Sequence, residues 1–127
     1  MILHRSDVLL TREEELPIPE PVRRLIEDFN SALLGETTDE NLLETTYGID
    51  ASVRNETRDR ISDYGSTVQS SVSSELAASY IIWNGGSWDL SATLFDTEGQ
   101  PTDLVASYNI VEHEEQYEIR FYDVYVP

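Results

Sequence analysis

Asp123 is the residue whose position in the sequence points most directly to chemistry. In the last hairpin we expect Glu112 to pair with Tyr117, and that register puts Asp123 on an apolar face, opposite Ala106. A buried carboxylate must be protonated, be paired with a cation or open onto a cavity. Asp123 would then be the acid or base of a pocket. The alternative, which we favour, is that the sheet ends there and Asp123 is solvated or caps a neighbouring backbone group.

Four aromatic side chains would accompany this carboxylate as the walls of a pocket or as an interface. The candidate pocket or interface residues are Trp83, Trp88, Tyr108, Asp123 and Tyr125. The two tryptophans flank a turn, so one interpretation is an exposed platform for a ligand or a partner chain. Cross-strand tryptophan pairs more often stabilise a hairpin and cover the core, and we favour this second interpretation.

No other motif points to catalysis or to a cofactor. His113 lies in an acidic stretch, but the only other histidine is His4 and the spacing is not that of a metal site, so a solvated turn is expected. Gly85 and Gly86 lie between two strands rather than at a phosphate-binding strand-to-helix turn. Cysteine is absent, and no Gly-x-Ser-x-Gly elbow occurs. We therefore predict no catalytic residues, no metal and no cofactor, and an enzyme is the less favoured class.

The charge of the chain limits its partners. Lysine and arginine number 8 against 25 acids, which gives a formal net charge of −17, and every cation is an arginine. Nucleic acids and anionic membranes are not expected partners, because both bind through clustered cations. The acids are spread through the whole chain, which favours adaptation to high salt, where the Debye length falls to about 3 Å at 1 M. Mimicry of DNA, which needs one concentrated acidic face, is the alternative.

Length and composition predict one domain in a cytoplasmic protein. A chain of 127 residues is long enough to bury a core without disulfide bonds. We therefore expect a single domain over 1–127, with 1–20 as an N-terminal extension. No run of about eighteen apolar residues occurs, and the first residues lack the features of a signal peptide. A membrane location is therefore not expected.

The first half of the chain predicts helices. The best one runs from Pro21 to Leu34, with apolar residues on one stripe and Gly35 placed to end it. A second, shorter helix follows a capping-box spacing at 37–40 and ends at Gly48. These helices should cover an apolar sheet.

Three other stretches of the first half are less regular. Residues 49–54 favour a short strand, and Asn55 is placed to cap a third helix that ends before Gly65. Residues 1–16 favour a short helix over an edge strand. The serine-rich stretch 66–74 is compatible with a helix or with a linker, and both remain open.

The second half predicts a four-strand antiparallel meander. In the hairpin at residues 80–90, Trp83 should pair with Trp88 across a polar turn. The further expected pairs are Ile81 with Leu90, Ser79 with Ala92, Ala77 with Leu94, Ile110 with Ile119 and Tyr108 with Phe121. One face of this sheet is apolar and should be buried.

The predicted fold class is α+β, with N-terminal helices packed on a C-terminal four-strand meander. This order of elements resembles the cone-shaped sheets of nuclear-transport-factor-like and cystatin-like proteins, a resemblance of architecture that carries no function. The leading hypothesis is a non-enzymatic, salt-adapted protein that acts through protein contacts or self-association. The alternatives are a pocketed binder or enzyme using Asp123, and an acidic inhibitor or DNA mimic that binds a basic partner.

Overall fold

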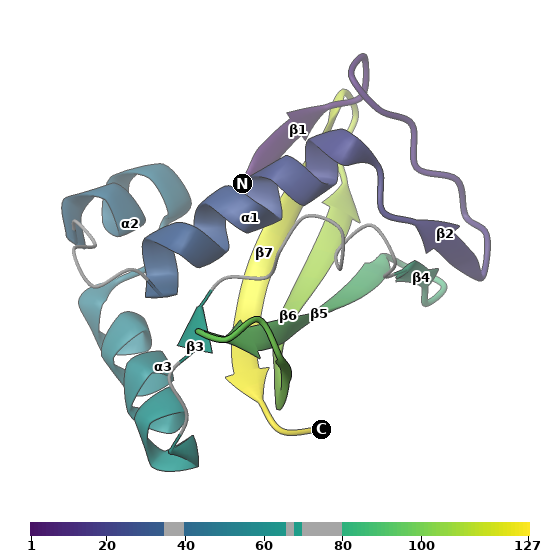
Figure 1. Ribbon diagram of the computed structural model, residues 1–127. Coiled ribbons are helices and arrows are strands. Elements are labelled where there is room, and N and C mark those ends of the chain that lie inside the picture. The colour runs from purple at the N-terminus through teal and green to yellow at the C-terminus, as the bar shows by residue number, and fades with distance from the viewer. Residues whose placement is uncertain (35–39, 66–67, 70–79) are drawn as a thin grey trace.

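The chain folds as helices against one antiparallel sheet (Figure 1). The computed structural model describes residues 1–34, 40–65, 68–69 and 80–127, with the backbone alone at 40–43 and 68–69. In chain order the elements are β1 (Ile2–His4), β2 (Glu15–Pro17), α1 (Glu20–Leu34), α2 (Glu40–Tyr47), α3 (Ala51–Tyr64), β3 (Val68–Gln69), β4 (Tyr80–Trp83), β5 (Trp88–Asp96), β6 (Pro101–Glu112) and β7 (Gln116–Tyr125). The α+β class is confirmed.

The sheet has seven strands rather than the four that the sequence predicted. Its order is β1-β7-β6-β5-β4-β2, and β3 pairs separately with β5. The predicted meander forms the centre from β4 to β7. The first segment of the chain supplies both edges, so the helix expected within residues 1–16 is wrong. The physical reason is visible in β1, where buried Leu3 lies between exposed Ile2 and His4, which is the period of a strand.

The register of the hairpin between β4 and β5 is confirmed. Trp83 pairs with Trp88, and Ile81 pairs with Leu90. The turn is held by Asn84, whose Oδ1 accepts hydrogen bonds from the backbone N–H groups of Gly86 at 3.0 Å and Ser87 at 2.9 Å. The predicted pairs of Ser79 and Ala77, and the stretch 70–74, lie outside the described residues.

The last hairpin follows the predicted register only as far as Phe121. The pairs Glu112 with Tyr117, Ile110 with Ile119 and Tyr108 with Phe121 are confirmed. A β-bulge then adds one residue to β7, so that Ser107 pairs with Asp123 and Ala106 pairs with Val124. The prediction that Asp123 lies on the apolar face is therefore wrong, because the extra residue gives the inward position to Val124, which is fully buried.

α1 fills the apolar inner face of the sheet, across which it lies in Figure 1. Its predicted stripe is buried, with Val22, Ile26, Phe29 and Leu33 all at most 1% exposed. They pack in one core with inward residues of the sheet, which include Trp88, Leu90, Ala106, Tyr108, Ile110, Tyr117 and Ile119. Burial of large apolar side chains contributes about 1.5–3 kcal/mol each before the entropy cost, so α1 is the main support of the sheet.

The other two helices have well-defined ends. α2 ends at Gly48, as predicted, where φ is +68°. The short strand predicted at 49–54 is wrong, because Asp50 caps α3 instead: its carboxylate accepts from the N–H groups of Ser52 at 2.8 Å and Val53 at 3.1 Å. Gly65 ends α3 with a left-handed φ of +85°. The C-cap predicted at Gly35 lies outside the described residues.

The first twenty residues contribute to the core. Leu3, Leu10 and Ile18 are buried in the same cluster as the α1 stripe. The N–H of Leu10 donates to the hydroxyl of Tyr117 at 3.0 Å. Within the described residues, no helix is long and apolar enough to cross a membrane.

Candidate functional site

The five residues predicted as a pocket or interface are not brought together. Trp83 and Trp88 lie at the β4–β5 turn, Tyr108 lies in the middle of the core, and Asp123 and Tyr125 lie near the end of β7. The two tryptophans share one environment, and the other three residues are described separately below.

The two tryptophans form a packed pair rather than a free platform. Their ring centroids are 4.7 Å apart. Trp88 is fully buried, and its indole N–H donates to the carbonyl of Thr11 at 2.9 Å. The guanidinium of Arg12 lies 5.0 Å from the centroid of the Trp83 ring, a cation–π contact. The segment between β1 and β2 thus covers the tryptophan pair. This agrees with the interpretation that the two rings cover the core.

Tyr108 belongs to a filled core. Its side chain is 1% exposed, and its hydroxyl donates to Oδ1 of Asn30 on α1, which is also buried. The rings of Phe29 and Phe121 contact it edge-on, with centroids 5.9 and 5.7 Å away. Burial raises the pKa of the Tyr108 hydroxyl, so this group stays protonated as a donor. A pocket wall at Tyr108 would require α1 to leave the sheet.

Asp123 acts at the edge of the sheet. Its carboxylate accepts from the backbone N–H of Val124 at 2.8 Å and forms an ion pair with Arg60 of α3. The expectation that the sheet ends at Asp123 is wrong, because β7 continues to Tyr125, but the carboxylate does cap a neighbouring backbone group, as the favoured alternative also expected. Tyr125 pairs with Val105 on the outer face and is 39% exposed.

The outer face of the sheet, on the side away from α1, is the best candidate for an interaction surface. Seven large apolar side chains are exposed among the described residues, and four of them point outward from this sheet. They are Ile2 on β1, Tyr80 and Ile82 on β4, and Tyr125 on β7. Small side chains, Ser91 and Ser107, lie between them. Exposed apolar groups that share one face mark interaction sites more often than scattered ones.

The charged groups of the outer face are held by local partners. Arg120 donates to Glu118 at 2.5 and 3.2 Å, and His113 lies 3.1 Å from the same carboxylate. These contacts, chiefly the hydrogen bond from Arg120, lower the pKa of Glu118 to about 2. Asp89 accepts from Asn84 at 2.9 Å and from Asn109 at 3.0 Å. Glu118 is therefore balanced by Arg120, whereas the partners of Asp89 are two uncharged amides.

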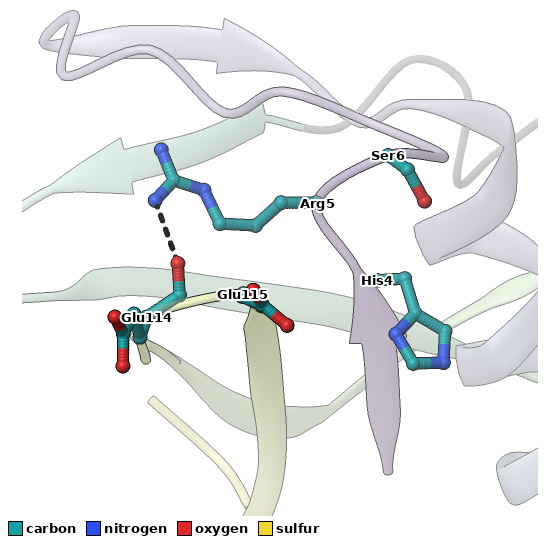
Figure 2. A pocket seen from close by; sticks show the side chains of 5 residues that line it. All are labelled: His4, Arg5, Ser6, Glu114 and Glu115. Carbon is teal, nitrogen blue, oxygen red and sulfur yellow. Dashed lines mark hydrogen bonds between the residues drawn. The ribbon is translucent and has the colours of Figure 1, made fainter.

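A polar hollow lies beside the β6–β7 turn. Figure 2 shows its lining, which comes from the end of β1 and from that turn: His4, Arg5, Ser6, Glu114 and Glu115. Its volume is about 390 Å³. Arg5 donates to the carbonyl of Glu114 at 3.2 Å and pairs with Glu112 at 3.2 Å. The guanidinium thus already joins β1 to the turn. Over the part of the chain that the structure describes, no group of three histidine or acidic side chains is placed to hold a metal ion.

The sequence analysis did not single out the outward residues of β4, which are Tyr80 and Ile82. Tyr80 and Ile82 alternate with Ile81 and Trp83, so the period of the strand was enough to place them outside. Arg60 carried no such signal, because its partner is 63 residues away in the sequence.

Comparison with known proteins gives one family. No curated protein and no solved structure matches the chain. A family model described as "Domain of unknown function (DUF7668)" matches residues 31–127, which is more than half of the chain. The match begins near the end of α1, so that β1, β2 and most of α1 precede it. The chain belongs to the DUF7668 family.

Proposed function

We propose that this protein acts without catalysis, by associating with a second copy of itself through the outer face of its sheet. The observation that carries the proposal is the outward set Ile2, Tyr80, Ile82 and Tyr125, which three strands, β1, β4 and β7, present on one side. The inner face offers no comparable surface, because α1 fills it.

The charge of the chain argues for a second copy as the occupant. A basic partner would be drawn to the acidic surfaces of a chain with a net charge of −17, whereas two carboxylates of the outer face, Glu118 and Asp123, are already paired with arginines. Two copies of a face that carries exposed apolar side chains and these ion pairs can meet in an isologous contact. The same net charge opposes association at low ionic strength, so the dimer should strengthen as salt screens the repulsion.

Sedimentation velocity at 0.1 and about 2 M KCl tests this proposal. We expect a dimer that is favoured at high salt and that Ile82→Arg disrupts. Leu9→Arg is the matched control, because Leu9 is exposed in the segment between β1 and β2 and does not lie on the outer face. A monomer at both salt concentrations, or equal dissociation by both variants, contradicts the proposal.

A salt-adapted, cytoplasmic setting remains part of the proposal. It is supported by the spread of acids over α1, α3 and the turns, where Glu27, Asp28, Asp59 and Asp63 are examples. DNA mimicry is less supported, because it needs these acids on one face. A pocket that uses Asp123 is also less supported, since that carboxylate is engaged by Arg60 and the inner face is filled. We therefore propose a likeness to the cone-shaped sheets of nuclear-transport-factor-like and cystatin-like proteins only for the curl of the sheet.

A further inference from the structure

Residues 6–14 connect the two edges of the sheet (Figure 1). They lie between β1 and β2, which stand at opposite ends of the strand order, so strand pairing fixes the chain on either side of them. Over this segment, which the structure describes in full, the chain forms neither a helix nor a strand. We call residues 6–14 the strap.

The strap is held to the sheet by few contacts. Leu10 is its one buried side chain, and Val8 is half-buried. The N–H of Leu10 donates to the Tyr117 hydroxyl at 3.0 Å, and the carbonyl of Thr11 accepts from the Trp88 indole at 2.9 Å. Segments with few buried apolar groups and an exposed backbone open locally, at a lower free energy than the whole domain. The strap has both features.

One carboxylate connects the strap to the fixed chain beside it. Oε1 of Glu112 lies 3.2 Å from the guanidinium of Arg5, and Oε2 lies 3.2 Å from the guanidinium of Arg12 in the strap. Arg5 is anchored, because its N–H donates to the carbonyl of Glu115 at 3.1 Å and its guanidinium to the carbonyl of Glu114 at 3.2 Å. Arg5 therefore orients Glu112, and Glu112 holds Arg12 in place.

Three aromatic rings lie beneath the strap. The Trp88 ring centroid is 4.7 Å from that of Trp83 and 5.7 Å from that of Tyr117. Trp88 and Tyr117 are fully buried, and both donate or accept a hydrogen bond with the strap backbone. The guanidinium of Arg12 lies over the Trp83 ring. Movement of the strap away from the sheet would therefore expose all three rings on this side.

We propose that the strap opens as a unit from these three rings while the rest of the chain stays folded, and that Glu112 is the latch that keeps it closed. Pairing of β1 and β2 holds both ends of the strap, so the loss of entropy on closing is small and opening is reversible. The strap thus controls access to Trp83, Trp88 and Tyr117. This device is separate from the outer face and does not depend on self-association.

Hydrogen exchange of the full chain, followed by NMR, tests whether the strap opens by itself. Two protons report on the strap directly, the backbone N–H of Leu10 and the indole N–H of Trp88, and the amides of the central strands β5 and β6 report on opening of the whole domain. We expect the protection factors of the two strap protons to agree within about threefold and to be at least about tenfold below those of the central amides. Strap protons that are protected as strongly as the central amides overturn the proposal, because the strap would then open only when the domain unfolds.

Glu112→Gln tests the latch in the same measurement. This variant keeps the size of the side chain and removes both ion pairs, so we expect it to speed exchange of the two strap protons at least about twofold and to leave the central amides unchanged. Glu114→Gln is the matched control, because Arg5 binds the carbonyl of Glu114 rather than its carboxylate, and it should leave the strap protons within about 1.5-fold. Equal exchange of the strap protons in the two variants overturns the proposal. Central amides that speed up as much as the strap protons in Glu112→Gln overturn it too, because the variant would then destabilise the whole domain.

Discussion

The buried hydrogen bond between Tyr108 and Asn30 makes a specific prediction about the core. The Tyr108 hydroxyl donates to Asn30 Oδ1, while Nδ2 of the same amide is buried without a partner among the described residues. Tyr108→Phe removes the donor and leaves Oδ1 unpaired as well. A buried acceptor that loses its partner costs about 1–3 kcal/mol. We therefore expect Tyr108→Phe to lower the free energy of unfolding by about 1–3 kcal/mol.

The double variant separates this cost from a general loss of packing. Asn30→Leu alone leaves the hydroxyl of Tyr108 buried without an acceptor, so it should also destabilise the protein. Asn30→Leu with Tyr108→Phe replaces both partners by apolar groups, a change that is close to neutral. The double variant should thus be more stable than either single variant, with a coupling energy of about 1–3 kcal/mol.

Urea unfolding followed by tryptophan fluorescence, at one fixed KCl concentration, measures these differences if the m-value is unchanged. A cost below about 0.5 kcal/mol for Tyr108→Phe would refute the reasoning, because effects of that size are typical of surface substitutions. A double variant whose loss equals the sum of the two single losses would refute it too.

Two further predictions concern charge. The melting temperature should rise between 0.1 and about 2 M KCl, because salt screens the repulsion within a chain of net charge −17; a melting temperature that does not change would contradict salt adaptation. The second concerns Glu118, whose pKa is lowered from 4.5 to about 2, chiefly by its hydrogen bond from Arg120. Its stabilising contribution is fully present above the ordinary pKa and is lost as the pH falls towards 2, so Glu118→Gln should flatten the decline in stability below about pH 4.5, measured by thermal melts. If the stability of the original chain and that of Glu118→Gln decline equally with falling pH, the contribution of the Glu118–Arg120 pair is contradicted.

The elements that the sequence predicts well are those with a long local period. α1 has four turns with the same apolar stripe, and β5, β6 and β7 each alternate over many residues, so their pairing follows from one or two turns. The position of Asp123 could not be obtained in this way. A bulge shifts every later residue to the opposite face, and the sequence around Tyr122 contains no glycine or proline that marks the extra residue.

Short elements with distant partners were the other source of error. β1 and β2 have three residues each, which is too few to establish a period, and their identity depends on Tyr117 and Ile81, far along the chain. At α3 two residues suited to an N-cap, Asp50 and Asn55, compete, and the earlier one forms the cap. In the candidate site, the outward residues of β4 were predictable from the alternation of the strand.

The pairing of Met1 with Ile119 has a consequence for folding. The partners are separated by 118 positions, and the other edge strand, β2, joins β4 across about half the chain. Such distant contacts raise the contact order and slow folding, because loop-closure entropy is lost before the contacts form. During synthesis β1 leaves the ribosome long before β7 exists, so the β1 edge of the sheet cannot form until β7 has been made. We expect a folding time of about milliseconds to seconds, which is typical of non-local topologies, even though the apolar stripe of α1 favours a helix locally.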